Sequence, residues 1–135
     1  MSLRSIPLIA ISLILYSVLV LLGGEGVLQK PLLTLPMPSK ASWAMTWGDL
    51  ILLVTLVLLF IEILKATYTS SASLIDHGLS MLVFVACLIM FLLVPKAATS
   101  VFFLITAATL IDVIAGYTIG IRVAKRDIGF GAGDA

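Results

Sequence analysis

The sequence predicts an all-α integral membrane protein: a single four-helix bundle with both termini in the cytoplasm. Hydrophobic residues make up 61% of the 135 residues and charged residues only 11%, which lies far from the composition of soluble domains. Four apolar runs are each long enough to cross a hydrocarbon core of about 30 Å. The runs are continuously apolar rather than alternating, and this favours helices over strands.

The first span is predicted at residues 6–22. Pro7 suits the first helical turn, and the pair Gly23-Gly24 suits a helix end. Arg4 before an apolar run could also indicate a secretory signal. The run of about 17 residues exceeds the usual core of about 7 to 15, so we expect a retained anchor.

The other three spans are predicted at residues 47–66, 74–94 and 100–123. The second begins with a capping box, in which the Thr46 hydroxyl and the Asp49 carboxylate satisfy each other's backbone amides. Ser73 and Asp76 repeat this pattern at the start of the third.

Basic residues near the span ends set the orientation, because cytoplasmic loops are enriched in Lys and Arg. An even number of spans places both termini on one side. That side carries Arg4, Lys65, Arg122, Lys125 and Arg126, against Lys30, Lys40 and Lys96 on the other. We therefore expect a multi-pass protein of the plasma membrane, the inner membrane of a bacterium, with Trp43 and Trp47 as outer interfacial anchors.

The outer loop 23–46 is long for a connection without strong secondary-structure signals. Pro31, Pro36 and Pro38 discourage helix across its middle, yet the loop is too apolar to lie free in water. It is expected on the outer membrane surface or against a partner, or else as a lid over the helix ends. The glycine-rich tail 127–135 is expected to be flexible.

Asp112 is a carboxylate inside the fourth apolar run. At about 1.5 Å per residue it lies about 15 Å from Arg122, close to the bilayer midplane. A charge at that depth costs about 2.5 to 3.5 kcal/mol, so Asp112 should face protein or water. The same rise per residue, counted from the cytoplasmic ends of their spans, places Tyr16 and Thr55 at this depth. Both could donate hydrogen bonds to the carboxylate.

Two interpretations of Asp112 stay open. It could bind a proton or cation during transport, or it could be a polar strut that holds helices together. Ala108, Asp112, Gly116 and Gly120 recur every four residues. This spacing predicts a close-packing face, within the chain or between copies, and favours the strut.

The remaining polar candidates lie at the inner rim of the bundle. Glu62 and Lys65 are spaced to pair on one helix face. Asp76 fits a helix cap, His77 could act as an interfacial acid or base, and Arg122 fits a topology signal.

The sequence contains no signature of an enzyme, a cofactor or a metal site. Cys87 and His77 are the only residues of their kinds, so this chain alone cannot form a disulfide or a Cys/His zinc site. A net charge of +1 gives no reason to expect nucleic acid as a partner.

We therefore expect a non-enzymatic subunit that contacts lipid and other membrane proteins, or copies of itself, through the fourth span and the outer loop. The alternative is a small homo-oligomeric transporter or channel that uses Asp112. A third, less favoured hypothesis is a lipid-modifying enzyme that uses Asp76 and His77.

Overall fold

The chain is mostly helical. A computed structural model describes residues 7–24, 26–68 and 73–133, and it contains four α-helices over this part of the chain. They are α1 (Ala10–Gly23), α2 (Trp47–Tyr68), α3 (Ser73–Leu93) and α4 (Ser100–Gly133).

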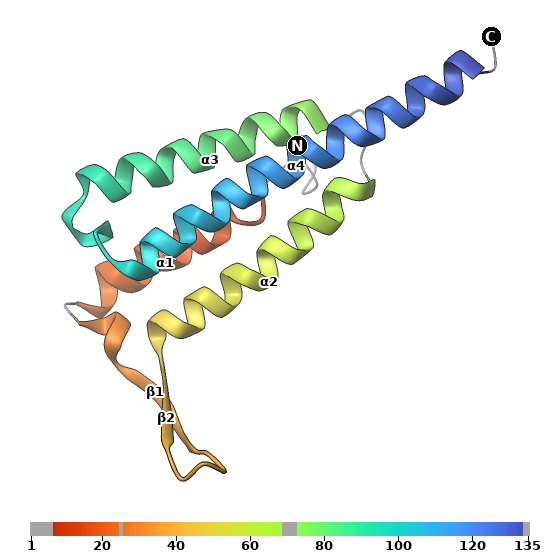
Figure 1. Cartoon of the computed structure of the whole chain (residues 1–135). Coiled ribbons are helices and arrows are strands. Elements are labelled where there is room, and N and C mark those ends of the chain that lie inside the picture. The colour runs from red at the N-terminus through yellow and green to blue at the C-terminus, as the bar shows by residue number, and fades with distance from the viewer. Residues whose placement is uncertain (1–6, 25, 69–72, 134–135) are drawn as a thin grey trace.

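The last helix is the central one. α4 packs against both α2 and α3, and α1 lies beside α2 and α4 (Figure 1). This arrangement is compatible with the predicted four-helix bundle. Within the described residues, Trp47–Thr67 and Ser100–Ile119 are helical stretches long and apolar enough to cross a membrane.

The capping box at the start of α2 is confirmed. The Thr46 amide donates to Asp49 Oδ2 over 3.1 Å, and the Asp49 amide donates to Thr46 Oγ1 over 3.2 Å. Gly48 lies within this capping box, where neighbouring atoms leave little room for a side chain. A Cβ at this position would lie 2.8 Å from a Val101 methyl group and 3.1 Å from the Leu28 carbonyl oxygen, so a side chain would force backbone to move.

The segment expected to lack secondary structure contains an antiparallel hairpin, so the all-α prediction was wrong at this point. A short 3₁₀ helix, η2 (Val27–Gln29), precedes strands β1 (Pro31–Pro36) and β2 (Ser42–Thr46). The hairpin projects sideways from the end of the bundle at which α1 ends and α2 begins (Figure 1).

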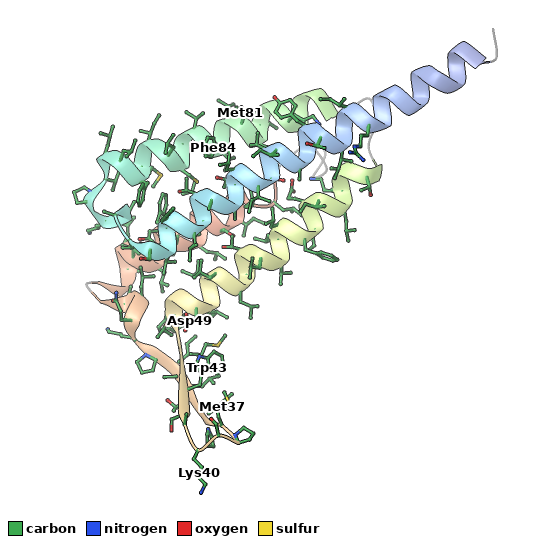
Figure 2. The ribbon with its side chains drawn as sticks, in the orientation of Figure 1. Met37, Lys40, Trp43, Asp49, Met81 and Phe84 are labelled. Carbon is green, nitrogen blue, oxygen red and sulfur yellow. The ribbon has the colours of Figure 1, made fainter. Side chains whose placement is uncertain are left out.

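A tight turn at Met37–Ala41 closes the hairpin. The Lys40 amide donates to the Met37 carbonyl over 2.9 Å, and the Met37 amide donates to the Ala41 carbonyl over 2.8 Å. Pro38 suits the second position of such a turn. Lys40 has a φ of 71°, the left-handed conformation that commonly follows a type I turn in hairpins. Figure 2 shows Lys40 at the tip.

The strand register gives the hairpin one apolar face. Leu33 pairs with Met45 and Leu35 with Trp43, and alternation along each strand puts these four side chains on the same side. Thr34 faces the other side. Leu33, Leu35 and Trp43 are all exposed, and Figure 2 shows Trp43 on the projecting strand.

The last helix is much longer than predicted. A 3₁₀ turn, η3 (Pro95–Ala97), joins α3 to α4, and α4 then continues through Gly133. The fourth span was predicted to end at residue 123, with a flexible tail from 127. Helix therefore replaces the expected tail, and Figure 1 shows it extending beyond the other helices. At about 1.5 Å per residue the 34 residues span about 50 Å.

Candidate functional site

The described interior of the bundle holds several polar side chains beside its apolar core, and much of the exterior is apolar. Seven buried residues are polar or charged: Ser12, Thr55, Glu62, Ser80, Thr106, Thr109 and Asp112. Exposed Leu, Ile, Val and Phe side chains occur on all four helices. Soluble proteins seldom expose this many large apolar side chains.

Asp112 is buried, as the sequence predicted, and its side chain is only 5% exposed. Ala108 and Gly116, one turn to either side of it, are also buried. Because α4 lies against α2 and α3, this face is used for packing inside the chain. Its use between copies, the other option left open, does not apply to these three residues. The fourth member, Gly120, also lies on α4, but its burial is not among the features that the structure describes.

His77 packs against the face of α4 that carries Asp112. Its imidazole stacks on the Tyr117 ring with centroids 4.8 Å apart. A Cβ at Gly116 would lie 3.0 Å from both Nδ1 and Cε1 of His77, so glycine makes room for the ring. Asp112 and Gly116 are neighbours on one helix face. The Asp112 carboxylate and the His77 imidazole therefore belong to the same face of α4.

Glu62 on α2 contacts the turn that leads into α1. Its Oε1 accepts a hydrogen bond from the Leu8 amide over 2.6 Å and pairs with Lys65 Nζ at 3.4 Å. The Lys65 pair is the one predicted from the spacing. The Leu8 contact was not predicted, and it satisfies a free amide in the turn that leads into α1 while placing a negative charge near its N-terminal end.

The polar groups at the end of the bundle away from the hairpin lie closer together along the bundle than the sequence suggested. Ile9, Leu59 and Ala108 share one apolar cluster and so mark one level of the bundle. Glu62 lies about 5 Å beyond this level and Asp112 about 6 Å beyond it, away from the hairpin. The expected difference in depth between Glu62 and Asp112 was therefore wrong, while the distance of either residue from a membrane boundary stays a prediction. It assumed that all helices end at one plane, whereas α4 continues past α2.

Tyr16 lies at the opposite end of the bundle from the predicted site. Its hydroxyl donates to the Lys96 carbonyl over 2.8 Å and lies 2.7 Å from Thr99 Oγ1. Thr99 precedes Asp112 by about 20 Å along α4, so the predicted Tyr16–Asp112 contact was wrong. The cause is an offset: α1 begins near the level of Ala108, so Tyr16 reaches the start of α4.

Thr55 also has other partners. Its hydroxyl lies 2.9 Å from Ser12 Oγ and 2.8 Å from the Ile51 carbonyl oxygen. Sequence reasoning missed Ser12 and Thr99, the side-chain partners of Thr55 and Tyr16. Both are small hydroxyl residues in or beside an apolar run, and that is the signal that could have found them.

The Arg122 side chain is exposed, and the side chain of Asp76 lies outside the described residues. Cys87 is buried. No group of three or more His, Cys, Asp or Glu residues that could hold a metal ion occurs in the described part of the chain.

Comparison with protein-family models, curated proteins and solved structures finds no match to this chain.

Proposed function

We propose that this chain is a four-span membrane protein that serves as a non-enzymatic subunit of a larger membrane assembly. The observation that carries the proposal is the apolar exterior of the bundle, together with polar side chains buried between the helices. Leu56 and Phe60 on α2 are 60% and 62% exposed, whereas Thr55 between α1 and α2 is buried. So many outward-facing apolar side chains are favourable in contact with lipid and unfavourable in contact with water.

The low burial of α2 argues against its being the core helix of a soluble protein. Only 22% of its most apolar window is buried inside the chain, whereas a core helix of a soluble protein is mostly covered. α2 also lies in the middle of the sequence, away from the position of a signal segment. The placement of both termini in the cytoplasm of a bacterium, across its inner membrane, remains part of this proposal and rests on the distribution of Lys and Arg.

The subunit role follows from what the polar interior does. Glu62 bonds to the α1 turn, Thr55 bonds to Ser12, and Tyr16 bonds to the start of α4. These interactions hold helix to helix. The Asp112 face is also used within the chain, so the apolar face of the hairpin is the surface that we assign to a partner.

The partner that we infer is another integral membrane protein. The hairpin leaves the bundle sideways (Figure 1), so its apolar face extends over whatever lies next to the bundle in the membrane. Leu35 and Trp43 form a cross-strand pair on this face, and exposed aromatic residues are typical anchors of protein interfaces.

The test is co-purification in mild detergent from native membranes, followed by mass spectrometry. Replacing Leu35 and Trp43 together by serine should release the partner. A matched control replaces Thr34 and Ala44 by serine, because this cross-strand pair lies on the opposite face. A partner that stays bound to the first variant, or is lost equally from both, contradicts the hairpin interface. A wild-type chain that purifies alone contradicts the subunit role.

A second candidate function is proton or cation transport. The observation that favours it is the presence of Glu62, His77 and Asp112 at one end of the bundle, two of them buried carboxylates. Ionisable residues inside membrane spans commonly mark ion or proton pathways.

This candidate is tested with the purified protein in liposomes that contain a pH-sensitive dye. Asp112→Asn should abolish flux and leave abundance unchanged if transport is the function. If Asp112→Asn instead lowers abundance and partner association, Asp112 is a strut and the transport hypothesis fails.

A further inference from the structure

The hairpin is a two-stranded sheet with two outer edges, and prolines interrupt the edge of β1. The Met37–Ala41 pair is hydrogen-bonded, and bonded pairs alternate with non-bonded pairs along an antiparallel ladder. Pro36 pairs with Ser42 in the next, non-bonded position, so its nitrogen points away from β2. Pro31, at the other end of β1, also lacks an amide donor. Prolines at these positions protect the outer edge of β1 from pairing with another strand.

The outer edge of β2 contains no proline. By the same alternation, the backbone amide and carbonyl groups of Ser42 and Ala44 point outward, and both residues are exposed. The Thr46 amide is bonded to Asp49 Oδ2, which limits the stretch available for pairing. β2 therefore presents the outward groups of two alternate residues to an added strand.

We propose that two copies of the chain join at this edge, β2 against β2, in one antiparallel sheet of four strands. A two-fold axis centred on Trp43 places Ser42 of each copy opposite Ala44 of the other. Each outward amide then donates to an outward carbonyl across the axis. The pairing also supports the hairpin, which lies outside the bundle (Figure 1), because two strands alone are marginally stable and three or more with an apolar face are not.

The side chains of β2 fit a second copy of the same strand. In this register Trp43 of one copy lies opposite Trp43 of the other as a non-bonded pair, the kind whose side chains approach most closely. Aromatic pairs across strands stabilise a sheet. Since Leu35 pairs with Trp43 within each hairpin, the apolar face continues from one copy to the other without a polar side chain between them.

The charges of the two copies are complementary as well. Lys40 at the hairpin tip (Figure 2) comes opposite Thr46 of the second copy in this register, and the Asp49 carboxylate is bonded to the Thr46 amide. Each lysine therefore approaches a carboxylate of the other copy. The two Lys40 residues lie on opposite sides of the axis, about 20 Å apart, so they do not repel each other strongly.

The symmetry of this pairing suits two copies in one membrane. The two-fold axis of an antiparallel edge pair is perpendicular to the sheet. Because the hairpin leaves the bundle sideways (Figure 1), a sheet with its apolar face toward the membrane has this axis along the membrane normal. Rotation about the normal keeps both bundles in the same orientation across the bilayer. The inference rests on the membrane placement proposed above but not on a different protein as partner.

The test counts photobleaching steps of the fluorescently tagged full chain in liposomes, which measures the fraction of dimers. Ala44→Pro removes one outward amide from each copy and should weaken association about tenfold or more, since two backbone hydrogen bonds are lost. Thr34→Pro is the matched control. Thr34 is paired with Ala44 within the hairpin, but its amide points to the outer edge of β1, so this variant should remain dimeric.

Disulfide cross-linking in membranes, with copper phenanthroline as the oxidant, tests the register. Trp43→Cys places two Cα atoms about 4.5 Å apart across the axis, which a disulfide can span, so covalent dimers should form. Leu35→Cys lies on the same apolar face, but its two copies would be about 15 Å apart in the paired sheet and should not cross-link. The buried Cys87 is present in every variant and in the wild-type control.

Four results would overturn the edge pairing. They are a monomeric wild type, an equal loss of dimers from both proline variants, cross-links at position 35 as abundant as those at position 43, and a chain that does not enter liposomes. The third would show that the apolar faces stack on each other instead, and the fourth contradicts the membrane placement itself. A monomer that still co-purifies with another membrane protein contradicts this inference and leaves the subunit role intact.

Discussion

Leu56→Lys tests whether the outer face of α2 contacts lipid. Leu56 is 60% exposed and lies near the middle of Trp47–Thr67. It is about 13 Å along the helix from Trp47. The lysine side chain would therefore have to cross much of the hydrocarbon before its ammonium group reached headgroups or water.

The expected cost follows from the change in transfer free energy. Leucine at a helix centre contributes about −0.3 to −0.6 kcal/mol to insertion and lysine costs about +2.5 to +3.5 kcal/mol. The difference is about 3 to 4 kcal/mol, or a factor of roughly 10² to 10³ in the insertion equilibrium. In water the same exposed substitution would change stability by about 0.5 kcal/mol or less.

The assay measures the amount of full-length protein in the membrane fraction that resists alkaline extraction. Leu56→Lys should reduce it strongly. Leu64→Lys is the control, since Leu64 is also exposed but lies about 6 Å from the end of α2. A lysine there can extend to the headgroup layer at little cost.

The reasoning is refuted if Leu56→Lys leaves the amount of protein unchanged or yields a folded, soluble monomer. Either result would mean that water, not lipid, covers this face. A similar loss from both variants would show an effect of added charge that does not depend on depth.

Three further predictions concern the contacts that hold the helices together, each measured by thermal unfolding in detergent. Tyr16→Phe should destabilise the fold by about 1 to 3 kcal/mol, because the hydroxyl makes two hydrogen bonds that contribute about 0.5 to 1.5 kcal/mol each. Glu62→Leu should be more destabilising than Glu62→Gln, because glutamine keeps an acceptor for the Leu8 amide. Gly116→Ala should be less stable than Gly78→Ala by about 1 to 3 kcal/mol, because the new methyl group would press on the His77 ring.

Two control substitutions test whether these losses of stability come from the named contacts. Gly78 has open space around the position of a Cβ, so alanine there should gain helix propensity without a clash. Tyr117→Phe removes a hydroxyl from a more exposed ring and should have little effect. Equal Tm shifts for the two tyrosine variants, or for the two glycine variants, would contradict the contacts described for Tyr16 and His77.

The helices were predictable because their signals are local. Apolar runs locate them, and Thr46 with Asp49 fixes the start of α2 through atoms three residues apart. The burial of Asp112 was predictable for a similar reason, since the cost of a carboxylate in lipid depends mainly on the length of the apolar run around it.

The hairpin was not predictable because its turn lacks the usual signal. The left-handed position is occupied by Lys40 rather than by glycine or asparagine, which commonly mark such turns. The prolines correctly argued against helix but did not reveal that Leu35 pairs with Trp43.

The partner of Tyr16 could not be predicted either. It depends on how far α1 is displaced along α4, and this displacement is set by packing at Ile9 and Ala108. Contacts of this kind join residues about 100 positions apart, and no local pattern in a single sequence encodes the offset.

The central position of α4 has a consequence for biogenesis. α4 follows α2 and α3 in the sequence, so both are synthesised before the helix against which they pack. Until then the polar side chains that face the bundle centre must be sheltered by lipid-embedded neighbours or by an insertion factor. In the membrane placement proposed above, ribosomes stalled before residue 100 should therefore leave an assembly intermediate that a membrane chaperone can bind.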